Sequence, residues 1–408
     1  MKAPVCRSCG THLETTFVDL GMSPLANSLL TSEQALVMEP FYPLHVRVCA
    51  KCFLVQLEEF EPPEHIFSDY LYFSSYSDAW LAHCSRYADK MVAMLGLGPR
   101  SKVVEVASND GYLLQFFAKR GIPVLGIEPA RNVAKVAIDK GIPSEVAFFG
   151  RRTAERLGSE HSADLIAAKN VLAHVPNIND FVAGFKALLK AGGTITVEFP
   201  HLMQLIHHNQ FDTIYHEHFS YLSLLSVEFI FERHGLSLYD VEEVPTHGGS
   251  LRIFAGHSDE KRASQPGLLS VREKERAAKL DRLETYTSFP EAVVQMKCDV
   301  LEFFVAQRRA GKTVVGYGAA AKGNSLLNYC GVGPEFMHYV VDRSPHKQGR
   351  FLPGSHIPVF DPSRILETRP DNVFILPWNL RDEIVSQMGA IRSWGGKFAI
   401  PIPRLEVF

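Results

Sequence analysis

The chain lacks the features that define several classes of protein. Its formal net charge is only −3, so there is no overall basic field to recruit nucleic acid or an acidic membrane surface. No apolar run approaches the roughly 20 residues of a bilayer span, and residues 182–189 are already interrupted by a lysine. The N-terminal MKAPVCRSCG has no signal-peptide core, so we expect a cytoplasmic protein.

Cysteine is also scarce. Seven cysteines in 408 residues are too few for a disulfide scaffold, yet four of them form two C-x-x-C knuckles, Cys6 with Cys9 and Cys49 with Cys52. One knuckle alone is compatible with a redox dithiol, whereas two can offer four thiolates to one tetrahedral zinc ion. The surrounding segment has little apolar mass. We therefore predict a structural Zn²⁺ that supplies much of its folding free energy.

What is present indicates a globular protein of more than one domain. Hydrophobic residues make up 46% of the chain and charged residues 21%, and the length exceeds that of one ordinary core. We expect a zinc-binding domain over residues 1–75, a second domain over residues 76–240 and a third over residues 241–408.

From residue 102 onward, short apolar strands alternate with amphipathic helices. This alternation predicts an α/β fold with a doubly wound parallel sheet, in which ligands bind at the carboxyl ends of the strands. The first strand, within residues 102–108, runs into the loop Asn109-Asp110-Gly111, whose N–H groups we expect to face a nucleotide-like ligand. Glu128 closes the second strand, where such sheets place an acid that accepts hydrogen bonds from a ribose diol.

Residues 210–223 (QFDTIYHEHFSYLS) break the alternation. They concentrate titratable and phenolic side chains in seven residues, which favours acid/base chemistry: Tyr215, His216, Glu217, His218 and Tyr221. A metal site is the alternative, because two histidines flank a carboxylate. Residues i and i+2 point apart on a helix, however, so acid/base chemistry is the preferred interpretation.

Two later segments hold candidate binding residues. His247 precedes a Gly-Gly turn and Arg252 lies on the next strand, so either a pocket role or simple turn chemistry fits. Residues 312–331 repeat the plan of strand, small-residue loop and helix without a Walker A motif. Gly318 and Lys322 there could receive a phosphate or only allow close packing.

Residues 265–310, between the two segments, are predicted to form bridging helices.

Four features together resemble the sugar C-methyltransferases that act on nucleotide-activated keto-deoxysugars: the two knuckles, E-V-A-S-N-D-G, Y-H-E-H-F-S-Y and G-Y-G-A-A-A-K-G-N. The resemblance covers essentially the whole chain. It implies a Rossmann-like domain that binds S-adenosyl-L-methionine (SAM), flanked by a small zinc-binding domain and a C-terminal Rossmann-like domain. A dTDP-, GDP- or CDP-linked sugar would lie between the SAM-binding domain and the C-terminal domain. We expect no nucleic-acid or membrane partner, and a monomer or weak dimer.

The motifs and the resemblance assign roles to individual residues. The expected catalytic residues are Tyr72, His174, Tyr215, Glu217 and His218, with Tyr70 a neighbouring alternative to Tyr72. The expected donor-binding residues are Glu105, Ala107, Asn109, Asp110, Gly111, Glu128 and Asn170. The expected acceptor-binding residues are Tyr221, His247, Arg252, Gly318, Lys322 and Asn324. Ala107 departs from the pattern, because many SAM enzymes have glycine there.

The implied chemistry is C-methylation through an enolate. A carbon beside a 4-keto group loses a proton when the enolate oxygen is stabilised. We expect His218 to remove the C3 proton, Glu217 to orient it or fix its tautomer, and Tyr215 with His174 to stabilise the oxygen. The alternatives are O- or N-methylation of a nucleotide sugar, an NAD-dependent oxidoreductase, which would need the absent G-x-G-x-x-G in the first loop, and a binding protein built on the knuckles.

Overall fold

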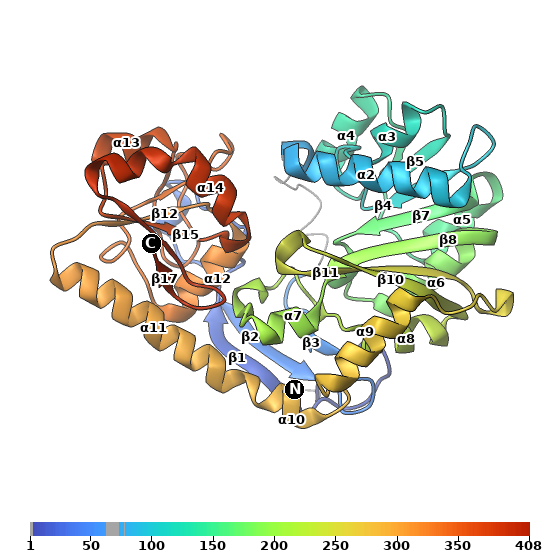
Figure 1. Cartoon of the computed structure of the whole chain (residues 1–408), viewed down its shortest axis with the longest axis horizontal. Helices are drawn as coiled ribbons and strands as arrows, with labels where there is room; N and C mark the ends of the chain where they lie inside the picture. Colours follow the sequence, from blue (N-terminus) through green and yellow to red (C-terminus); the bar gives the residue numbers. More distant parts are fainter. Residues whose placement is uncertain (1–2, 63–72, 77) are drawn as a thin grey trace.

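Three β-sheets form the framework of the computed structural model, which describes residues 3–62, 73–76 and 78–408 (Figure 1). An antiparallel N-terminal sheet lies at the base, between a seven-stranded middle sheet and a six-stranded C-terminal sheet. The predicted α/β fold is confirmed. None of the helices in the described ranges is long and apolar enough to cross a bilayer.

The N-terminal sheet has the order β1-β2-β3-β9. Its strands are β1 (Thr15–Ser23), β2 (Tyr42–Val48), β3 (Val55–Leu57) and β9 (Ser220–Tyr221). The last strand comes from far along the chain, and it pairs Tyr221 with Val55 and Ser220 with Gln56. The histidine-rich segment is therefore attached to the edge of the zinc-binding unit.

The middle sheet has the order β10-β11-β8-β7-β4-β5-β6. Its strands are β4 (Val103–Val106), β5 (Val124–Ile127), β6 (Ser144–Glu145), β7 (Ala163–Lys169), β8 (Leu189–Pro200), β10 (Leu236–Val244) and β11 (Ser250–His257). The five strands from β8 to β6 are parallel, and the β10–β11 hairpin adds to β8 in the antiparallel sense. The expected boundary at residue 240 thus falls inside β10, and the sheet continues to His257.

Helices cover both faces of the middle sheet, as a doubly wound sheet requires. One face packs mainly on α5 (Arg151–His161), α6 (Ile178–Leu188), α8 (Leu224–Arg233) and α9 (Pro266–Ala277). The other packs on α2 (Asp78–Leu95), α3 (Leu114–Ala118) and α4 (Arg131–Asp139). All four residues of β4 are buried, and accordingly all of them except Glu105 are valines.

The C-terminal sheet has the order β14-β13-β12-β15-β16-β17 and is parallel except for β17. Its strands are β12 (Val314–Tyr317), β13 (Val340–Val341), β14 (Val359–Phe360), β15 (Asn372–Ile375), β16 (Lys397–Ile400) and β17 (Glu406–Val407). Its helices are α12 (Ala321–Cys330), α13 (Ser363–Thr368) and α14 (Arg381–Gln387). Because α12 begins at Ala321, most of the predicted small-residue loop is the first turn of a helix.

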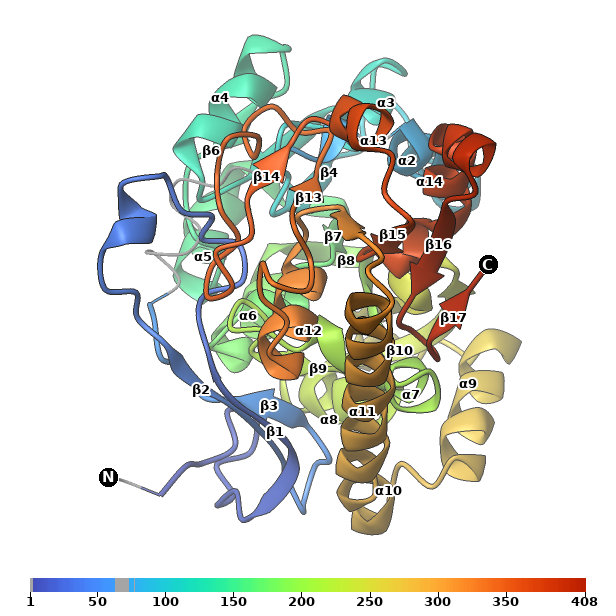
Figure 2. The ribbon, with the colours of Figure 1, turned by 90° about the vertical axis from the view of Figure 1, so that its left-hand side faces the viewer.

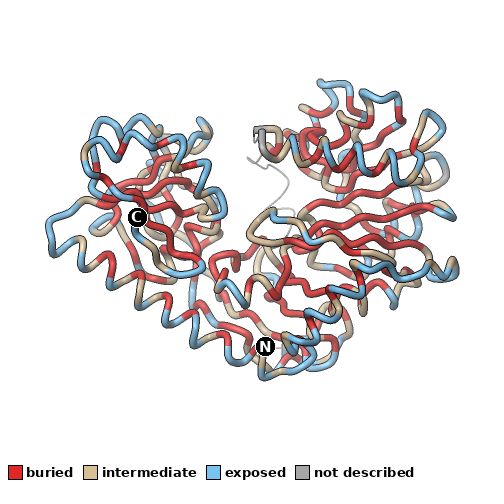
Figure 3. The backbone as a smooth tube through the Cα atoms, in the orientation of Figure 1, coloured by how far each residue is buried: buried red, intermediate tan, exposed pale blue. Residues whose placement is uncertain are grey.

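A shared apolar core joins the three units. The predicted bridging segment, residues 265–310, forms α9, α10 (Leu283–Thr287) and α11 (Phe289–Arg309), of which α9 packs on the middle sheet and α11 runs from the N-terminal sheet along the C-terminal unit (Figure 2). Phe17 of β1 stacks on Phe289 at 4.7 Å between ring centroids. The short helix α7 (Leu202–His207) packs into the same core. Buried residues are concentrated in the central strands of both large sheets and in this junction (Figure 3).

Candidate active site

A cavity of about 540 Å³ opens where the three units meet. Its walls come from the loops after β4, β5 and β7, from the histidine-rich segment and from the start of α12. Predicted site residues that line it are Ala107, Asn109, Glu128, Asn170, His174, Tyr215, Glu217, His218, Tyr221, His247 and Lys322. The structure therefore brings most of the catalytic, donor-binding and acceptor-binding candidates together around one cavity.

Glu128 organises the end of the cavity nearest β4 and β5. One carboxylate oxygen accepts the N–H of Asn109 at 2.9 Å and the other accepts the N–H of Ala130 at 3.0 Å. These bonds hold the two loops side by side. Burial raises the pKa of Glu128, and the two N–H donors oppose that shift. The backbone at Ala107 has φ +57° and that at Asn109 has φ +48°, so this loop is left-handed without a glycine at residue 107.

Three predicted donor residues support this loop without lining the cavity. Glu105 is fully buried beneath it, and burial raises the pKa of Glu105 well above its usual range. Asp110 accepts from Lys140 Nζ at 3.2 Å. Gly111 has φ +77°, and a Cβ there would lie 3.1 Å from Ile142, so the turn requires glycine.

His218 lies at the centre of an aromatic cluster. Its ring centroid is 4.1 Å from that of Tyr215 and 4.7 Å from that of His174. Its Nδ1 lies 2.8 Å from the carbonyl oxygen of Thr213. Because a carbonyl only accepts, Nδ1 carries the proton and Nε2 is left as the basic nitrogen. Burial is the main reason that the pKa of His218 lies well below its usual value, so the ring is neutral at pH 7.

The tautomer of His218 is thus fixed by the main-chain carbonyl of Thr213, whereas an orienting role of Glu217 stays a prediction. Glu217 accepts a hydrogen bond from Asn27 Nδ2 at 2.6 Å. Asn27 comes from the N-terminal unit and also lines the cavity. Burial lowers the pKa of the neighbouring His174 to about 4.

His216 lies outside this cluster. Its ring packs between Tyr42 and Phe60, and its Nε2 lies 3.2 Å from the carbonyl oxygen of Pro43. The side chains of His216 and His218 therefore diverge, as expected for residues i and i+2. Among the residues that the structure describes, only the four knuckle cysteines form a group able to hold a metal ion.

The wall contributed by the C-terminal unit is basic. Lys322, in the first turn of α12, lies over the ring of Trp378 at 4.5 Å from the centroid, and its Nζ donates to Asn379 at 3.2 Å. Trp378 Nε1 donates in turn to Asp212 at 2.7 Å. Burial raises the pKa of Asp212 to about 6. Lys347 lines the cavity beside Lys322.

Three predicted acceptor residues lie away from the cavity wall. The N–H of Gly318 donates to the carbonyl of Val341 at 2.7 Å, and a Cβ there would meet Pro377 at 2.5 Å. Close packing thus accounts for this glycine. Asn324 is a buried residue of α12. Arg252 is engaged with two carboxylates, and Tyr72 lies outside the described residues.

A buried ionic network next to the cavity was missed by sequence reasoning. Lys169 Nζ lies 2.6 Å from Glu198, which also accepts from Arg252 at 2.9 Å. His83 Nε2 lies 3.0 Å from the same carboxylate. The available signal was a lysine and a glutamate at the ends of two buried apolar strands, where an isolated charge is too costly to bury.

The four knuckle cysteines converge at one point. The Sγ atoms of Cys6 and Cys52 are 3.5 Å apart, as are those of Cys9 and Cys49, and all four lie within 4.8 Å of one another. A tetrahedral zinc with Zn–S bonds of about 2.3 Å needs S···S separations of roughly 3.8 Å. The four thiolates therefore fit Zn²⁺.

Comparison with known proteins agrees with this arrangement. C-methyltransferase NovU of Streptomyces niveus is 36% identical over 403 residues, which cover 98% of this chain and 96% of NovU. This chain belongs to the C-methyltransferase family. Family models match residues 6–67 ("Putative zinc binding domain"), 80–241 ("Methyltransferase domain") and 245–403 ("C-methyltransferase C-terminal domain").

More distant matches are confined to parts of the chain. A ubiquinone biosynthesis O-methyltransferase of Bordetella avium (strain 197N) is 32% identical over 97 residues, 23% of this C-methyltransferase and 40% of the relative. Among solved structures, magnesium protoporphyrin IX methyltransferase (ChlM) from Synechocystis PCC 6803 with bound SAM matches at a TM-score of 0.33 and 16% identity. That match covers 44% of this chain and 81% of ChlM.

The protein is therefore an enzyme that uses SAM as its methyl donor and carries a four-cysteine zinc-binding domain. The donor loop fits SAM, because Glu128 and Asn109 line the cavity next to the carboxyl ends of β4 and β5. A carboxylate at this point suits a ribose diol. The N–H groups of the left-handed residues Ala107 and Asn109 do not serve the donor, because they donate to the carbonyl of Ile127 at 2.8 Å and to Glu128 at 2.9 Å.

We expect Glu128→Gln to weaken binding of S-adenosylhomocysteine by roughly 10- to 100-fold, because a hydrogen bond to a charged group contributes about 1.5–3 kcal/mol. Titration calorimetry gives the dissociation constants directly. Glu145→Gln is the matched control, since Glu145 pairs with Arg156 outside the cavity. Equal affinities of the wild type and the Glu128 variant would contradict a ribose contact.

Proposed function

We propose that this C-methyltransferase methylates C3 of a nucleotide-activated 4-keto-deoxyhexose through an enolate. The observation that carries the proposal is a neutral histidine, His218, whose basic Nε2 is set by the Thr213 carbonyl and which lines the same cavity as Asn109 and Glu128. A carbon acceptor needs such a base, because its proton must leave before the carbon can attack a methyl group.

In the proposed reaction, His218 Nε2 takes the C3 proton, and the electron pair of the broken C–H bond moves onto the keto oxygen. Tyr215 and His174 lie against His218 and serve as hydrogen-bond donors to that oxygen. SAM, when bound, supplies the electrophilic methyl group, whose bonding pair stays on sulfur as the new C–C bond forms. His218 keeps the proton until product leaves.

The basic wall supports a nucleotide diphosphate as the carrier of the sugar. Lys322 and Lys347 line the cavity opposite the donor loop, together with Ala320 and Ala321 at the start of α12. A helix N-terminus and lysines both favour phosphate. Burial lowers the pKa of Lys322, so neighbouring anionic phosphate would stabilise its charged form.

The test is incubation of the purified protein with SAM and a panel of dTDP-, GDP- and CDP-linked 4-keto-deoxyhexoses. We expect a mass gain of one methylene with at least one of them, and an NMR signal for a methyl group on a fully substituted carbon. Without SAM, solvent deuterium should still exchange into C3. A new O–CH₃ or N–CH₃ signal, or no product with the whole panel, would overturn the proposal.

A further inference from the structure

The first zinc knuckle touches both segments that carry the cavity residues His174 and His218. Arg7 lies between the ligands Cys6 and Cys9, and its side chain is directed away from them. Its NH1 donates to the carbonyl of Pro176 at 2.9 Å, two residues after His174. Its guanidinium also lies over the ring of Phe219, at 5.4 Å from the centroid.

The contacts are reciprocal and continue into the sheet. Asn179 Nδ2 donates to the carbonyls of Arg7 and Ser8, both at 2.9 Å. The Arg7 N–H donates to Gln56 Oε1 at 2.8 Å, and Gln56 Nε2 donates to Cys6 Sγ at 3.2 Å. Gln56 is also the residue that pairs with Ser220 of β9. The knuckle thus contacts the segment around His174 through side-chain hydrogen bonds, and it is linked to the segment around His218 through the pairing of Gln56 with Ser220 in the sheet.

The two segments are also joined to each other next to the knuckle. The N–H of Phe219 donates to the carbonyl of Ala173 at 2.8 Å, between residues adjacent to His218 and His174. Arg7 NH2 donates to Leu57 of β3 on the same side. A single guanidinium therefore contacts the zinc-binding sheet and both sides of this junction.

We propose that Arg7 is a positioning residue that makes the zinc knuckle set the relative placement of His174 and His218. This inference rests on the proposed function, because it takes those histidines as the reacting pair. Arginine suits the task, since its planar fork donates in two fixed directions while its flat face stacks on an aromatic ring. Lysine can satisfy only part of this geometry.

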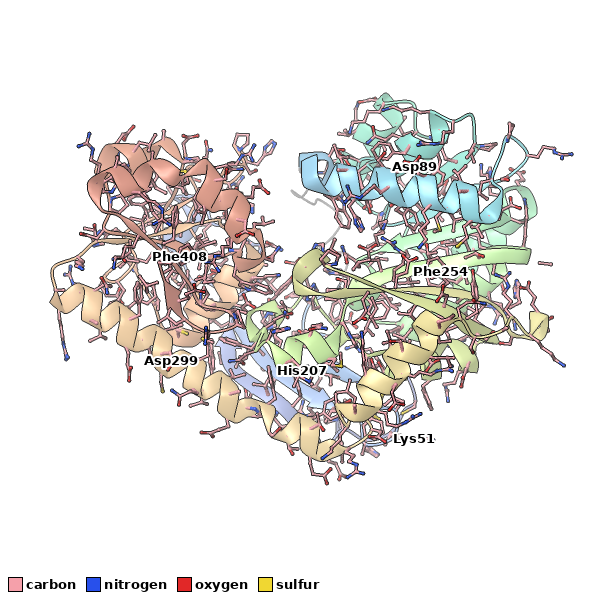
Figure 4. All side chains as sticks on the ribbon, viewed as in Figure 1. Lys51, Asp89, His207, Phe254, Asp299 and Phe408 are labelled. Atoms are coloured by element: carbon pink, nitrogen blue, oxygen red, sulfur yellow. The ribbon has the colours of Figure 1, made fainter. Side chains whose placement is uncertain are left out.

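Hydrogen-exchange mass spectrometry on the zinc-loaded full-length protein tests the placement without any acceptor. In Arg7→Met we expect faster exchange in peptides covering residues 171–179 and 215–222, and unchanged exchange in residues 103–111 and 314–330. Lys51→Met is the matched control. It removes a cation from the second knuckle, where Lys51 is exposed at the outer edge of the molecule (Figure 4).

Turnover gives the second readout, with whichever nucleotide sugar of the panel the wild type methylates. Because a misplacement of about 1 Å can cost roughly 100-fold in rate, we expect kcat to fall roughly 10- to 100-fold in Arg7→Met. Zinc content and the S-adenosylhomocysteine dissociation constant should remain those of the wild type. Arg7→Lys should give an intermediate kcat, which a purely structural role would not produce in a fully folded variant.

Two results would overturn the inference: wild-type exchange in both peptides of a zinc-loaded Arg7→Met protein, or wild-type kcat in that protein. If Arg7→Met does not fold, Asn179→Ala tests the same link from the other side and should give the same pattern of exchange. If the wild type methylates none of the panel, the proposed function fails. The hydrogen-exchange result still tests whether Arg7 holds the two segments in place.

Discussion

Replacing His218 with alanine is expected to lower kcat by roughly 100- to 10,000-fold, the range that a positioned general base contributes. The imidazole is held by the Thr213 carbonyl and by the rings of Tyr215 and His174, and the substitution removes the basic nitrogen that the carbonyl leaves unprotonated. Steady-state kinetics with the methylated acceptor measure the loss. Deuterium exchange into C3 without SAM should fall by a similar factor.

Two comparisons separate a lost base from a damaged fold. His216→Gln changes the other histidine of the motif, which packs outside the cavity, and should keep kcat near that of the wild type. The wild-type pH profile gives the second comparison. The base must be neutral to act and burial lowers the pKa of His218, so activity should persist below pH 6.5 and fall only as pH approaches the lowered value. Near wild-type turnover in His218→Ala would contradict the assignment.

The fold was predictable because local pattern and tertiary structure agree along most of the chain. The strand-helix alternation from residue 102 reappears as β4, α3, β5 and α4 in the expected order. The same pattern could not show that β10 and β11 extend the middle sheet, because an antiparallel hairpin adds to an edge strand without any local signal. Nor could it show β9, whose two residues form a strand only by pairing with β3.

The candidate site was predictable where a motif carries the chemistry and was not where packing assembles it. The motif around His218 identified the titratable cluster, but the residue that fixes its tautomer is Thr213, through a carbonyl that every residue possesses. Asn27 reaches Glu217 across 190 positions of sequence. Gly318 was compatible with a phosphate-binding loop, because the sequence does not distinguish a glycine that close packing requires from a glycine that a ligand requires.

Removal of zinc should unfold the N-terminal unit and abolish activity with it. Structural zinc sites contribute apparent binding free energies of about 10–16 kcal/mol, comparable to the whole stability of a domain. We expect either Cys52→Ser or treatment with a chelator to remove the metal, lower the melting temperature and expose β1 to β3 to hydrogen exchange. Cys298→Ser is the matched control, because that cysteine is exposed and distant in sequence from the knuckles.

The same measurement distinguishes a structural metal from a catalytic one. The knuckle thiolates are joined to the cavity only through protein contacts, such as the bond from Arg7 to Pro176, so activity and protection of residues 171–179 should disappear together during chelation. Both should return together when Zn²⁺ is restored. If chelation abolished turnover while exchange and melting temperature stayed at wild-type values, the metal would have to act in the chemistry itself, and its assignment as a structural ion would be wrong.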